Sequence, residues 1–416
     1  MILLDGLNSL GIETWLLVGQ KRTDHPRVIP FHLSPFFDYR VYEARDVGRS
    51  DRRRRLEQWF GLEDFNYPYS HHLLELTGPP PDVVICHNLH GGFFDLRALP
   101  ELCRRVPVIL RLFDTWLFAG HCAYSNGCRR WETGCGRCPD LKIPPAIQRD
   151  ATRINWWRKQ RVFRSSSLIA SAESQWMIER AKQSILAPAV SKWSHVAGGV
   201  DLAVFSPGSV HEARQKLKLA DDINVLLYVA NFGAYSPFKD FETVRNALRE
   251  IGRRAPQQKI ELLVVGSAAP DERITPDILV RHIGRVQSQH ELAAFYRAAD
   301  LYVHSTFEET FGNSVAEALA CGRPVVTASQ GGVVELMEHE RTGMVVPPRS
   351  PVELAQALLA VLDKPALAKT MGASAAISAR GRLDSRDTVH GMFELAQQAH
   401  AEWHHRRSTD SGLWSA

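Results

Sequence analysis

The stretch that decides the fold is Glu309-Thr-Phe-Gly-Asn-Ser-Val-Ala-Glu-Ala-Leu-Ala-Cys-Gly322. It predicts a loop that leads into a short helix, because Asn313 or Ser314 can cap the first turn. Gly322 suits the position after the last helical residue, where a left-handed backbone is common. Pro324 then prevents the helix from continuing.

Apolar runs flank this stretch on both sides. Leu301–His304 comes before it and Val325–Ala328 after it, and both are typical of buried strands. The loop therefore lies at the carboxyl end of a strand, where open α/β sheets bind ligands.

Two carboxylates stand at different depths in this unit. Glu309 precedes the predicted helix, and Glu317 lies about one turn inside it. Unpaired N–H groups and a partial positive charge at a helix start suit a diphosphate. The two carboxylates can then bind hydroxyl groups on a sugar and on a ribose. Taken alone, the pair also fits a surface helix with two ordinary glutamates.

The wider context resembles a known family. Seven residues separate Glu309 from Glu317, Phe311-Gly312 follows the first glutamate, and Ala320-Cys-Gly-Arg-Pro-Val325 closes the helix. This pattern resembles the retaining GT-B glycosyltransferases of family 4, over nearly the whole chain. The resemblance implies an α/β protein of two facing, doubly wound Rossmann-like domains, with the active site in the cleft between them.

Length and composition agree with a two-domain protein. A chain of 416 residues is long enough for two cores, and its 44% hydrophobic and 23% charged residues are ordinary for a globular protein. The net charge of +4 is too small to indicate nucleic acid. Since no apolar run has transmembrane length and no signal peptide opens the chain, we expect a cytoplasmic protein, with the inner face of the membrane as a further location.

The expected organisation has four parts. Residues 1–200 form an acceptor-side domain with a Cys-rich insertion at 120–140, and residues 201–385 bind the nucleotide sugar. A terminal helix, 386–405, crosses back to the first domain, and 406–416 is a polar tail. The chain opens with a predicted helix, Met1–Leu10, where the family has a strand and a glycine-rich turn. Either the natural start lies upstream, which we favour, or the protein lacks this loop.

Polar residues follow two predicted strands of the first domain. His87 and His90 come after the strand Pro81–Cys86, where they can handle a proton, bind the substrate or complete a turn. Asp114 follows the strand Val106–Leu112 and can orient a substrate hydroxyl or cap a helix. Phe113 stands before it, where the resembling family has a histidine. We place His87 and Asp114 beside Glu309 as catalytic candidates.

Four cysteines lie within seventeen residues. Cys122, Cys128, Cys135 and Cys138 are spaced so that they could enclose one tetrahedral zinc ion, which would be structural because four thiolates leave no open position. A disulfide pair or free packed thiols are the alternatives. The segment also resembles a cysteine-rich insertion in family members that act in polysaccharide synthesis.

Two basic segments have a membrane interpretation. Arg45–Arg55 contains six arginines that could contact anionic lipid or a lipid-diphosphate acceptor, or simply face solvent. The predicted helix Ile154–Arg164 carries Trp156 and Trp157 and could cover the cleft, touch a membrane or pack in the core.

The second domain supplies the rest of the expected donor site. Lys239 follows the strand Val225–Ala230 and precedes a helix, which suits a diphosphate, and it matches the phosphate-binding lysine of the resembling family. Gly233 stands where that family often has an arginine, for which Arg285 or Arg323 could substitute. The full expected donor-binding set is Gly233, Lys239, Ile283, Val286, Phe311, Gly312, Asn313, Ser314 and Glu317, with the backbone around Ile283 and Val286 reading the nucleobase.

The resemblance implies transfer of a sugar from a nucleoside diphosphate sugar to an acceptor hydroxyl with retention of configuration. No cofactor is required in this scheme, and the acceptor is a sugar or a lipid-linked saccharide, in the synthesis of bacterial surface polysaccharide. Two alternatives stay open. One is a degenerate, non-catalytic sugar-nucleotide-binding module, and the other is a GT-B sugar-nucleotide epimerase.

Overall fold

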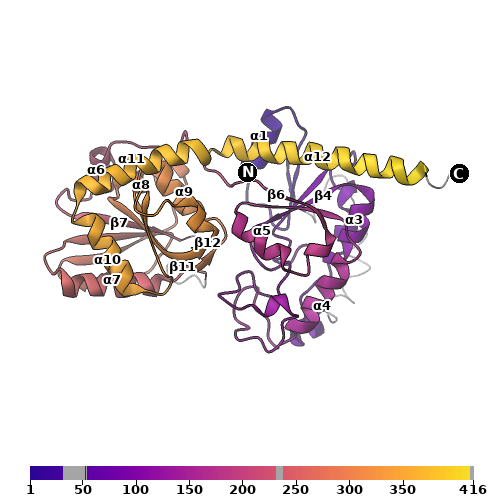
Figure 1. The fold of residues 1–416 in the computed structure, drawn as a ribbon, viewed down its shortest axis with the longest axis horizontal. Coiled ribbons are helices and arrows are strands. Elements are labelled where there is room, and N and C mark those ends of the chain that lie inside the picture. The colour runs from indigo at the N-terminus through magenta and orange to yellow at the C-terminus, as the bar shows by residue number, and fades with distance from the viewer. Residues whose placement is uncertain (31–51, 53, 231–237, 413–416) are drawn as a thin grey trace. The chain divides into compact units, whose positions relative to one another are not determined.

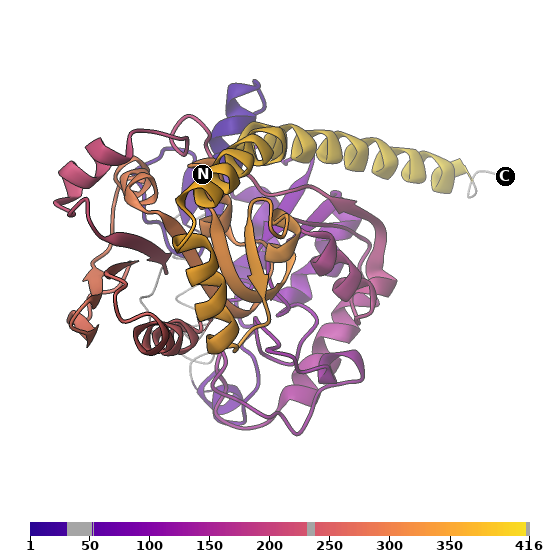
Figure 2. The same ribbon diagram turned by 60° about the vertical axis from the view of Figure 1, so that its left-hand side comes forward.

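The computed structural model describes residues 1–30, 52, 54–230 and 238–412. It forms two compact units, one of Met1–Val196 with Val389–Ala416 and one of Ala197–Thr388 (Figures 1 and 2). The first boundary between the units lies at residues 196 and 197, and the predicted acceptor-side and donor-side roles of the two domains stay predictions. The last helix, α12 (Ser385–Gly412), begins in the second unit and has most of its residues in the first. It continues past residue 406, so the expected start of an irregular tail there is wrong.

The second unit is built on a seven-stranded sheet in the order β13-β12-β11-β7-β8-β10-β9. All neighbours are parallel except β9, which runs antiparallel to β10. The strands are β7 (Asn224–Val229), β8 (Ile260–Val265), β9 (Glu272–Thr275), β10 (Ile278–Ile283), β11 (Leu301–Glu309), β12 (Val325–Gly331) and β13 (Gly343–Val346). The strand order reverses between β7 and β11, which makes this pair of strands the topological switch point.

Both faces of this sheet are covered by helices, as a parallel sheet requires. Alternate strand residues face α7 (Phe241–Arg254) and α10 (Pro351–Leu362) on one side, among them Leu226, Leu262 and Val303. The other residues, including Leu227, Leu263 and Tyr302, face the opposite layer. That layer consists of α6 (Val210–Leu217), α8 (Gln289–Ala298), α9 (Asn313–Ala320) and much of α11 (Pro365–Arg382). The unit is therefore doubly wound, as the sequence predicts.

The first unit contains a four-stranded parallel sheet in the order β3-β4-β5-β6. Its strands are β3 (Val84–His87), β4 (Val108–Leu112), β5 (Leu168–Ala172) and β6 (Val190–His195), and its other helices are α1 (Ile2–Ser9), α3 (Leu99–Arg105), α4 (Thr152–Phe163) and α5 (Gln175–Lys182). A separate parallel pair joins β1 (Leu16–Val18) to β2 (Val28–Pro30). Residues 54–59 are also helical, and short 3-10 turns at 68–75, 96–98, 130–132, 187–189 and 332–336 complete the elements of the described residues.

The terminal helix is part of the core of the first unit. Met392, Leu395 and Ala399 of α12 are buried against Ile109 and Ile169, which point to one face of the four-stranded sheet. The other face packs on a larger cluster with α3 and α5. At 25 cal/mol per Å² of buried apolar surface, side chains of this size stabilise by about 1.5–3 kcal/mol each. Removal of α12 would therefore expose a face of the sheet.

None of the helices in the described part of the chain is both long enough and apolar enough to cross a membrane.

Candidate functional site

The site of the second unit lies at its switch point. Lys239 stands in the connection between β7 and α7, and Glu309 is the last residue of β11, the strand beside β7. The backbone N–H of Asp240 donates to the carbonyl of Ser305 at 3.0 Å, which ties the β7–α7 connection to β11. Parallel strands bring their carboxyl ends to one edge of the sheet, so these two residues meet although 70 positions separate them.

Lys239 and Glu309 form an ion pair, with Nζ 2.9 Å from Oε2. The ring of His304 completes the cluster, since its Nε2 lies 3.3 Å from Lys239 Nζ and 3.7 Å from Glu309 Oε2. The other ring nitrogen, Nδ1, lies 3.1 Å from the hydroxyl of Thr327. The structure thus brings together the predicted Lys239 and Glu309 and adds His304, a residue that the sequence analysis did not select.

An irregularity in β11 explains how His304 reaches Glu309. Residues five apart in a regular strand point to opposite faces and lie about 16 Å apart along it. Here the register against β12 shifts between Ser305 and Glu308, so that one extra residue is inserted in β11. An inserted residue reverses the alternation of side chains. His304 and Glu309 therefore face the same side.

The electrostatics of the cluster keep its glutamate ionised and its histidine neutral. Burial by itself raises the pKa of Glu309, but the charge of Lys239 and the hydrogen bond from His304 outweigh it and hold the pKa well below the usual range. Burial, followed by the charge of Lys239, lowers the pKa of His304 to about 4. At neutral pH the cluster consists of an ammonium, a carboxylate and a neutral imidazole.

Two glycines allow the chain to pass close to Glu309. A Cβ atom at Gly331 would lie 2.5 Å from the carbonyl oxygen of Glu309, and one at Gly312 would lie 2.7 Å from Val333. Both glycines have positive φ angles, 102° and 93°, which other residues rarely adopt. A side chain at either position would displace the Glu309 backbone or the turn that follows it.

The turn after Glu309 leads into α9. Gly312 occupies the N-cap position, and no side chain caps this end. The prediction that Asn313 or Ser314 caps the helix is therefore wrong, because both are already helical. Asn313 is exposed, Ser314 is half-buried and Phe311 is buried in the core. At the other end Gly322 has φ 70°, as predicted for the position after the helix.

Glu317 has a different environment from Glu309. The hydroxyl of Tyr296 donates to its Oε2 at 2.7 Å, and burial raises the pKa of Glu317 to about 7. Among the described residues no cation lowers the pKa of Glu317, whereas Lys239 lowers the pKa of Glu309. The two predicted carboxylates thus differ in protonation near neutral pH.

The remaining predicted donor residues have separate outcomes. Gly233 lies outside the described residues. Ile283 ends β10, and its carbonyl accepts from the N–H groups of Gly266 and Ser267 at 2.9 and 3.0 Å. Val286 is half-buried in the connection between β10 and α8. The nucleobase contacts expected of these two residues stay a prediction.

Of the two arginines considered as substitutes for a missing charge, Arg323 is excluded. Its guanidinium donates to the carbonyls of Ala299 and Cys321, beyond the carboxyl end of α9 and thus away from the helix start. Arg285 is exposed in the connection between β10 and α8.

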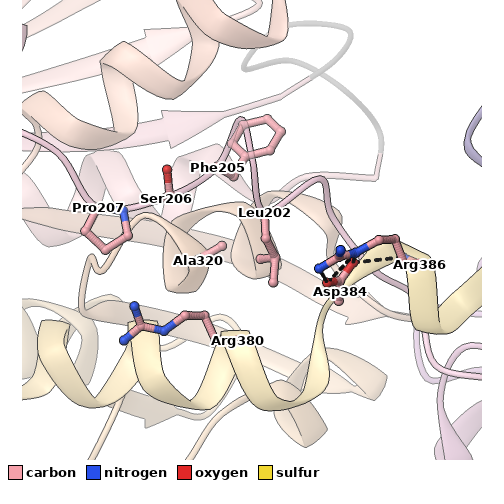
Figure 3. Close-up of a pocket in the computed structure, with 8 residues that line it drawn as sticks. All are labelled: Leu202, Phe205, Ser206, Pro207, Ala320, Arg380, Asp384 and Arg386. Carbon is pink, nitrogen blue, oxygen red and sulfur yellow. Dashed lines mark hydrogen bonds and ion pairs between the residues drawn. The ribbon is translucent and has the colours of Figure 1, made fainter.

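A cavity of about 300 Å³ also lies at the far end of α9 (Figure 3). Ala320, the last residue of that helix, lines it together with the segment Leu202–Pro207 and the segment Arg380–Arg386, where Asp384 pairs with Arg386. Neither Lys239 nor Glu309 borders it. This cavity is distinct from the cluster at the switch point.

In the first unit the structure favours His90 over His87. The ring Nε2 of His90 lies 2.7 Å from Asp114 Oδ2, whereas His87 stacks on Phe113 with ring centroids 5.5 Å apart. Burial, with the charge of Arg111, lowers the pKa of His87 to about 4, which makes it a poor proton acceptor at neutral pH. Asp114 Oδ1 also accepts from the N–H of Trp116 at 2.9 Å. Since no helix begins at this position, Asp114 caps a turn and not a helix.

A buried lysine fixes the turn that carries Asp114. Lys159 of α4 donates to the carbonyls of Trp116 and Ala119 at 2.7 and 3.0 Å and forms an ion pair with Glu63. All three N–H bonds of the ammonium therefore have partners. Lys159 of α4 thus holds the turn after β4 in place.

The four clustered cysteines are free thiols. Burial raises the pKa of Cys122 to about 12 and that of Cys135 to about 11. Among the residues that the structure describes, no three His, Cys, Asp or Glu side chains are arranged to hold a metal ion. The structural zinc site expected at Cys122, Cys128, Cys135 and Cys138 stays a prediction.

Residues 223–364 match the family model described as glycosyl transferases group 1. The matched segment contains Lys239, His304, Glu309 and Glu317. The D-inositol 3-phosphate glycosyltransferase of Frankia alni is 35% identical over 199 residues, which are 45% of this chain and 48% of the relative. The enzyme named D-inositol 3-phosphate glycosyltransferase 2 of Catenulispora acidiphila is 35% identical over 185 residues, 41% of this chain and 43% of the relative.

The alignments thus span less than half the length of these curated relatives. Solved structures match over more of the chain. Sucrose-phosphate synthase from Thermosynechococcus elongatus superposes with a TM-score of 0.66 at 18% identity, over 96% of this chain and 92% of that one. Anabaena HepE in complex with UDP and glucose gives 0.56 at 18% identity, over 79% and 81%.

The fold is GT-B. This likeness confirms the predicted fold class, and the match to the glycosyl transferases group 1 model lies within the second unit. The assignment to family 4 and the likeness of the Cys-rich insertion to a polysaccharide sub-group stay predictions.

Proposed function

We propose that this protein is a glycosyltransferase that moves a sugar from a nucleoside diphosphate sugar to an acceptor hydroxyl, with retention of configuration. The observation that carries the proposal is the cluster of Lys239, Glu309 and His304 at the switch point, beside the uncapped start of α9. A cation and free helix N–H groups next to a carboxylate suit a ligand that combines a diphosphate with a sugar.

In the proposed reaction the ammonium of Lys239 leaves Glu309 and binds the diphosphate of the donor. Its ammonium then stabilises the negative charge that develops as the bond between the anomeric carbon and the phosphate oxygen breaks. The released carboxylate of Glu309 accepts hydrogen bonds from sugar hydroxyls. The acceptor oxygen forms the new bond on the same face of the sugar, and its proton passes to the leaving phosphate. This scheme needs no metal and no separate general base.

Glu317 serves a different part of the donor in this proposal. Its oxygen atoms accept from Tyr296 and, we propose, from ribose hydroxyls. Its pKa near 7 makes the protonated carboxyl available as a donor as well as an acceptor. Loss of Glu317 is therefore expected to weaken donor binding more than it slows the chemical step.

The proposed donor and the proposed acceptor each rest on one likeness. HepE, a structural neighbour, was solved with UDP and glucose and with UDP-glucose, and we propose a UDP-sugar as donor on that ground. The curated relatives are named for transfer to D-inositol 3-phosphate. We propose a polyol phosphate or a saccharide of surface-polysaccharide synthesis as acceptor, with residues 1–200 as the acceptor side and a cytoplasmic location.

The test is a thermal-shift panel with UDP, GDP, ADP, CMP and dTDP. A nucleotide at 100 times its dissociation constant should raise the free energy of unfolding by about 2.7 kcal/mol. We expect a clear shift with UDP that is lost in Lys239→Ala and kept in Lys259→Ala, an exposed lysine paired with Asp222. Absence of any shift at millimolar nucleotide would contradict the donor assignment.

Turnover separates the proposal from its two alternatives. With UDP-glucose, a transferase releases UDP by transfer or slow hydrolysis, and Glu309→Gln should slow this release by about 10²–10³-fold. A non-catalytic module would bind UDP without releasing it from the sugar nucleotide, and an epimerase would return an isomeric sugar nucleotide. Chromatography of the nucleotide products distinguishes these outcomes.

A further inference from the structure

Two neighbouring segments of the first unit expose large apolar side chains. Residues 54–59 are helical and Phe60 follows them, while α4 begins at Thr152 (Figure 1). In the described part of the chain ten large hydrophobic side chains are exposed, and five of them lie here. They are Leu56, Trp59, Phe60, Ile154 and Trp157, with between 47% and 57% of their surface accessible. Single exposed apolar residues are ordinary, but this concentration is not.

Direct contacts join the two segments. The side-chain amide of Asn155 donates to the carbonyl of Gly61 at 3.0 Å, and its oxygen accepts from the N–H of Glu63 at 3.0 Å. The guanidinium of Arg149 lies 3.5 Å from the centre of the Trp59 ring. The helical segment 54–59 is thus anchored beside the start of α4 in the same unit.

The exposed face of α4 is defined by its spacing. Asn155, Lys159 and Val162 are buried, whereas Ile154, Trp157, Arg161 and Arg164 are exposed and follow one another at intervals of three and four residues. Such intervals place side chains on one face of a helix. Trp156 lies off this stripe, and its ring N–H donates to the carbonyl of Trp131 at 2.7 Å. Of the two tryptophans singled out in the sequence, only Trp157 faces solvent.

Arginines surround the apolar side chains. Residues 149–164 contain six basic residues and a single acidic one, Asp150. Apart from Lys159 and Arg158, which contact Glu63, these basic residues are exposed. The exposed cations next to the apolar side chains are Arg52, Arg55, Arg149, Arg153, Arg161 and Arg164.

We propose that this aromatic–arginine surface, formed by residues 52 and 54–60 and the exposed side of 149–164, binds the surface of a bilayer that contains anionic lipid. Tryptophan prefers the boundary between headgroups and acyl chains, and arginines pair with anionic headgroups. The excess of positive charge over a compact apolar patch matches this partner by charge complementarity. The proposal goes beyond the transfer reaction and does not depend on it.

The test is flotation of the full chain with vesicles, without substrate. We expect binding to vesicles of phosphatidylcholine and phosphatidylglycerol in equal parts, little binding to phosphatidylcholine alone, and release by high salt. Each arginine near an anionic surface contributes about fivefold to the partition coefficient, so Arg161→Glu with Arg164→Glu should reduce binding by about 30-fold or more. Trp59→Ala with Trp157→Ala should reduce it at least about tenfold.

Matched controls come from the second unit. Lys369→Glu with Arg380→Glu changes the net charge by the same amount at exposed positions, and Val352→Ala with Ile377→Ala removes apolar side chains that are 40% and 59% exposed. Both control variants should bind vesicles like the unaltered protein. Because all replaced side chains are exposed, circular dichroism should show unchanged folding.

Three outcomes would overturn the proposal. The first is no binding to the anionic vesicles, and the second is equal binding by all four variants. The third is that light scattering shows the unaltered chain to be a dimer which the Trp59 and Trp157 replacements dissociate. In that case the surface joins two copies of the protein.

Discussion

Among the described residues each unit largely buries one lysine–glutamate pair, and the two pairs differ in what surrounds the ammonium. The Nζ–Oε2 distance is 2.9 Å in both Lys159–Glu63 and Lys239–Glu309. The ammonium of Lys159 is fully enclosed and donates to two backbone carbonyls besides the carboxylate. Lys239 is 16% exposed, and its recorded partners among the described residues are Glu309 and His304.

The difference teaches how one kind of ion pair can serve two purposes. A buried ammonium whose three N–H bonds all have partners holds chain segments together but has no capacity for a ligand. A pair at the carboxyl edge of a sheet, beside a helix start, can exchange partners when an anion arrives. On this basis we assign a structural role to the Lys159 pair and propose a functional role for the Lys239 pair.

The largest expected effect separates the two pairs by activity. Glu309→Gln keeps the size of the side chain but removes the charge that orients Lys239 and the sugar. We expect the rate at which UDP is released from UDP-glucose to fall by about 10²–10³-fold. This is the range for loss of one electrostatic contact in an active site. The control is Glu63→Gln, which should leave the rate of the folded fraction unchanged. Equal losses of rate in both variants would contradict the assignment of different roles to the two lysine–glutamate pairs.

The second effect concerns stability. Lys159→Met removes the ammonium but leaves the carboxylate of Glu63 and the carbonyls of Trp116 and Ala119 buried without a donor. Such a loss typically reduces the free energy of unfolding by about 3–5 kcal/mol. Hydrogen exchange read by mass spectrometry should show faster exchange in the first unit, whereas Lys239→Met should change exchange little.

Much of this arrangement could be predicted from the sequence. The strands around Glu309 and the one before Lys239 follow from apolar runs, and parallel strands place both residues at one edge of the sheet. The position of Gly322 after the helix also follows from its lack of a side chain. These features are local, or need only the general rule for ligand sites in α/β sheets.

Other features depend on geometry that no local pattern specifies. His304 joins the cluster only because β11 contains an extra residue before Glu308. The choice of His90 over His87 depends on the turn after β3, where Asn88 has a φ of 40°. The failure of Asn313 to cap α9 has a similar cause, since Gly312 already occupies the cap position in a left-handed conformation. A histidine inside an apolar strand, as at 304, is the one signal that the sequence offered.

A third prediction uses the raised pKa of Glu317. In the folded protein this pKa is about 7, above the ordinary value of 4.5, so the folded state binds more protons than the unfolded state between these pH values. Stability should therefore fall as pH rises from about 4.5 to about 7, by at most about 3 kcal/mol. Glu317→Gln should remove this dependence in urea titrations at several pH values. If Glu317→Gln kept the same dependence of stability on pH, a group other than Glu317 would be its cause.

The smallest expected effect concerns His304, whose pKa is lowered from 6.5 to about 4. Between these values the unfolded chain takes up a proton that the folded protein does not, so acid should destabilise the folded state as pH falls through this window. His304→Gln lacks the titrating ring and can keep a hydrogen bond to Thr327, so it should be the less acid-sensitive protein. Thermal melts at pH 7 and pH 5 measure the difference. The control is His339→Gln, which replaces an exposed histidine in the same unit and should behave as the unaltered chain. If His304→Gln lost as much stability as the unaltered protein, the ring would not be the neutral partner of Lys239, and the cluster would instead contain two cations.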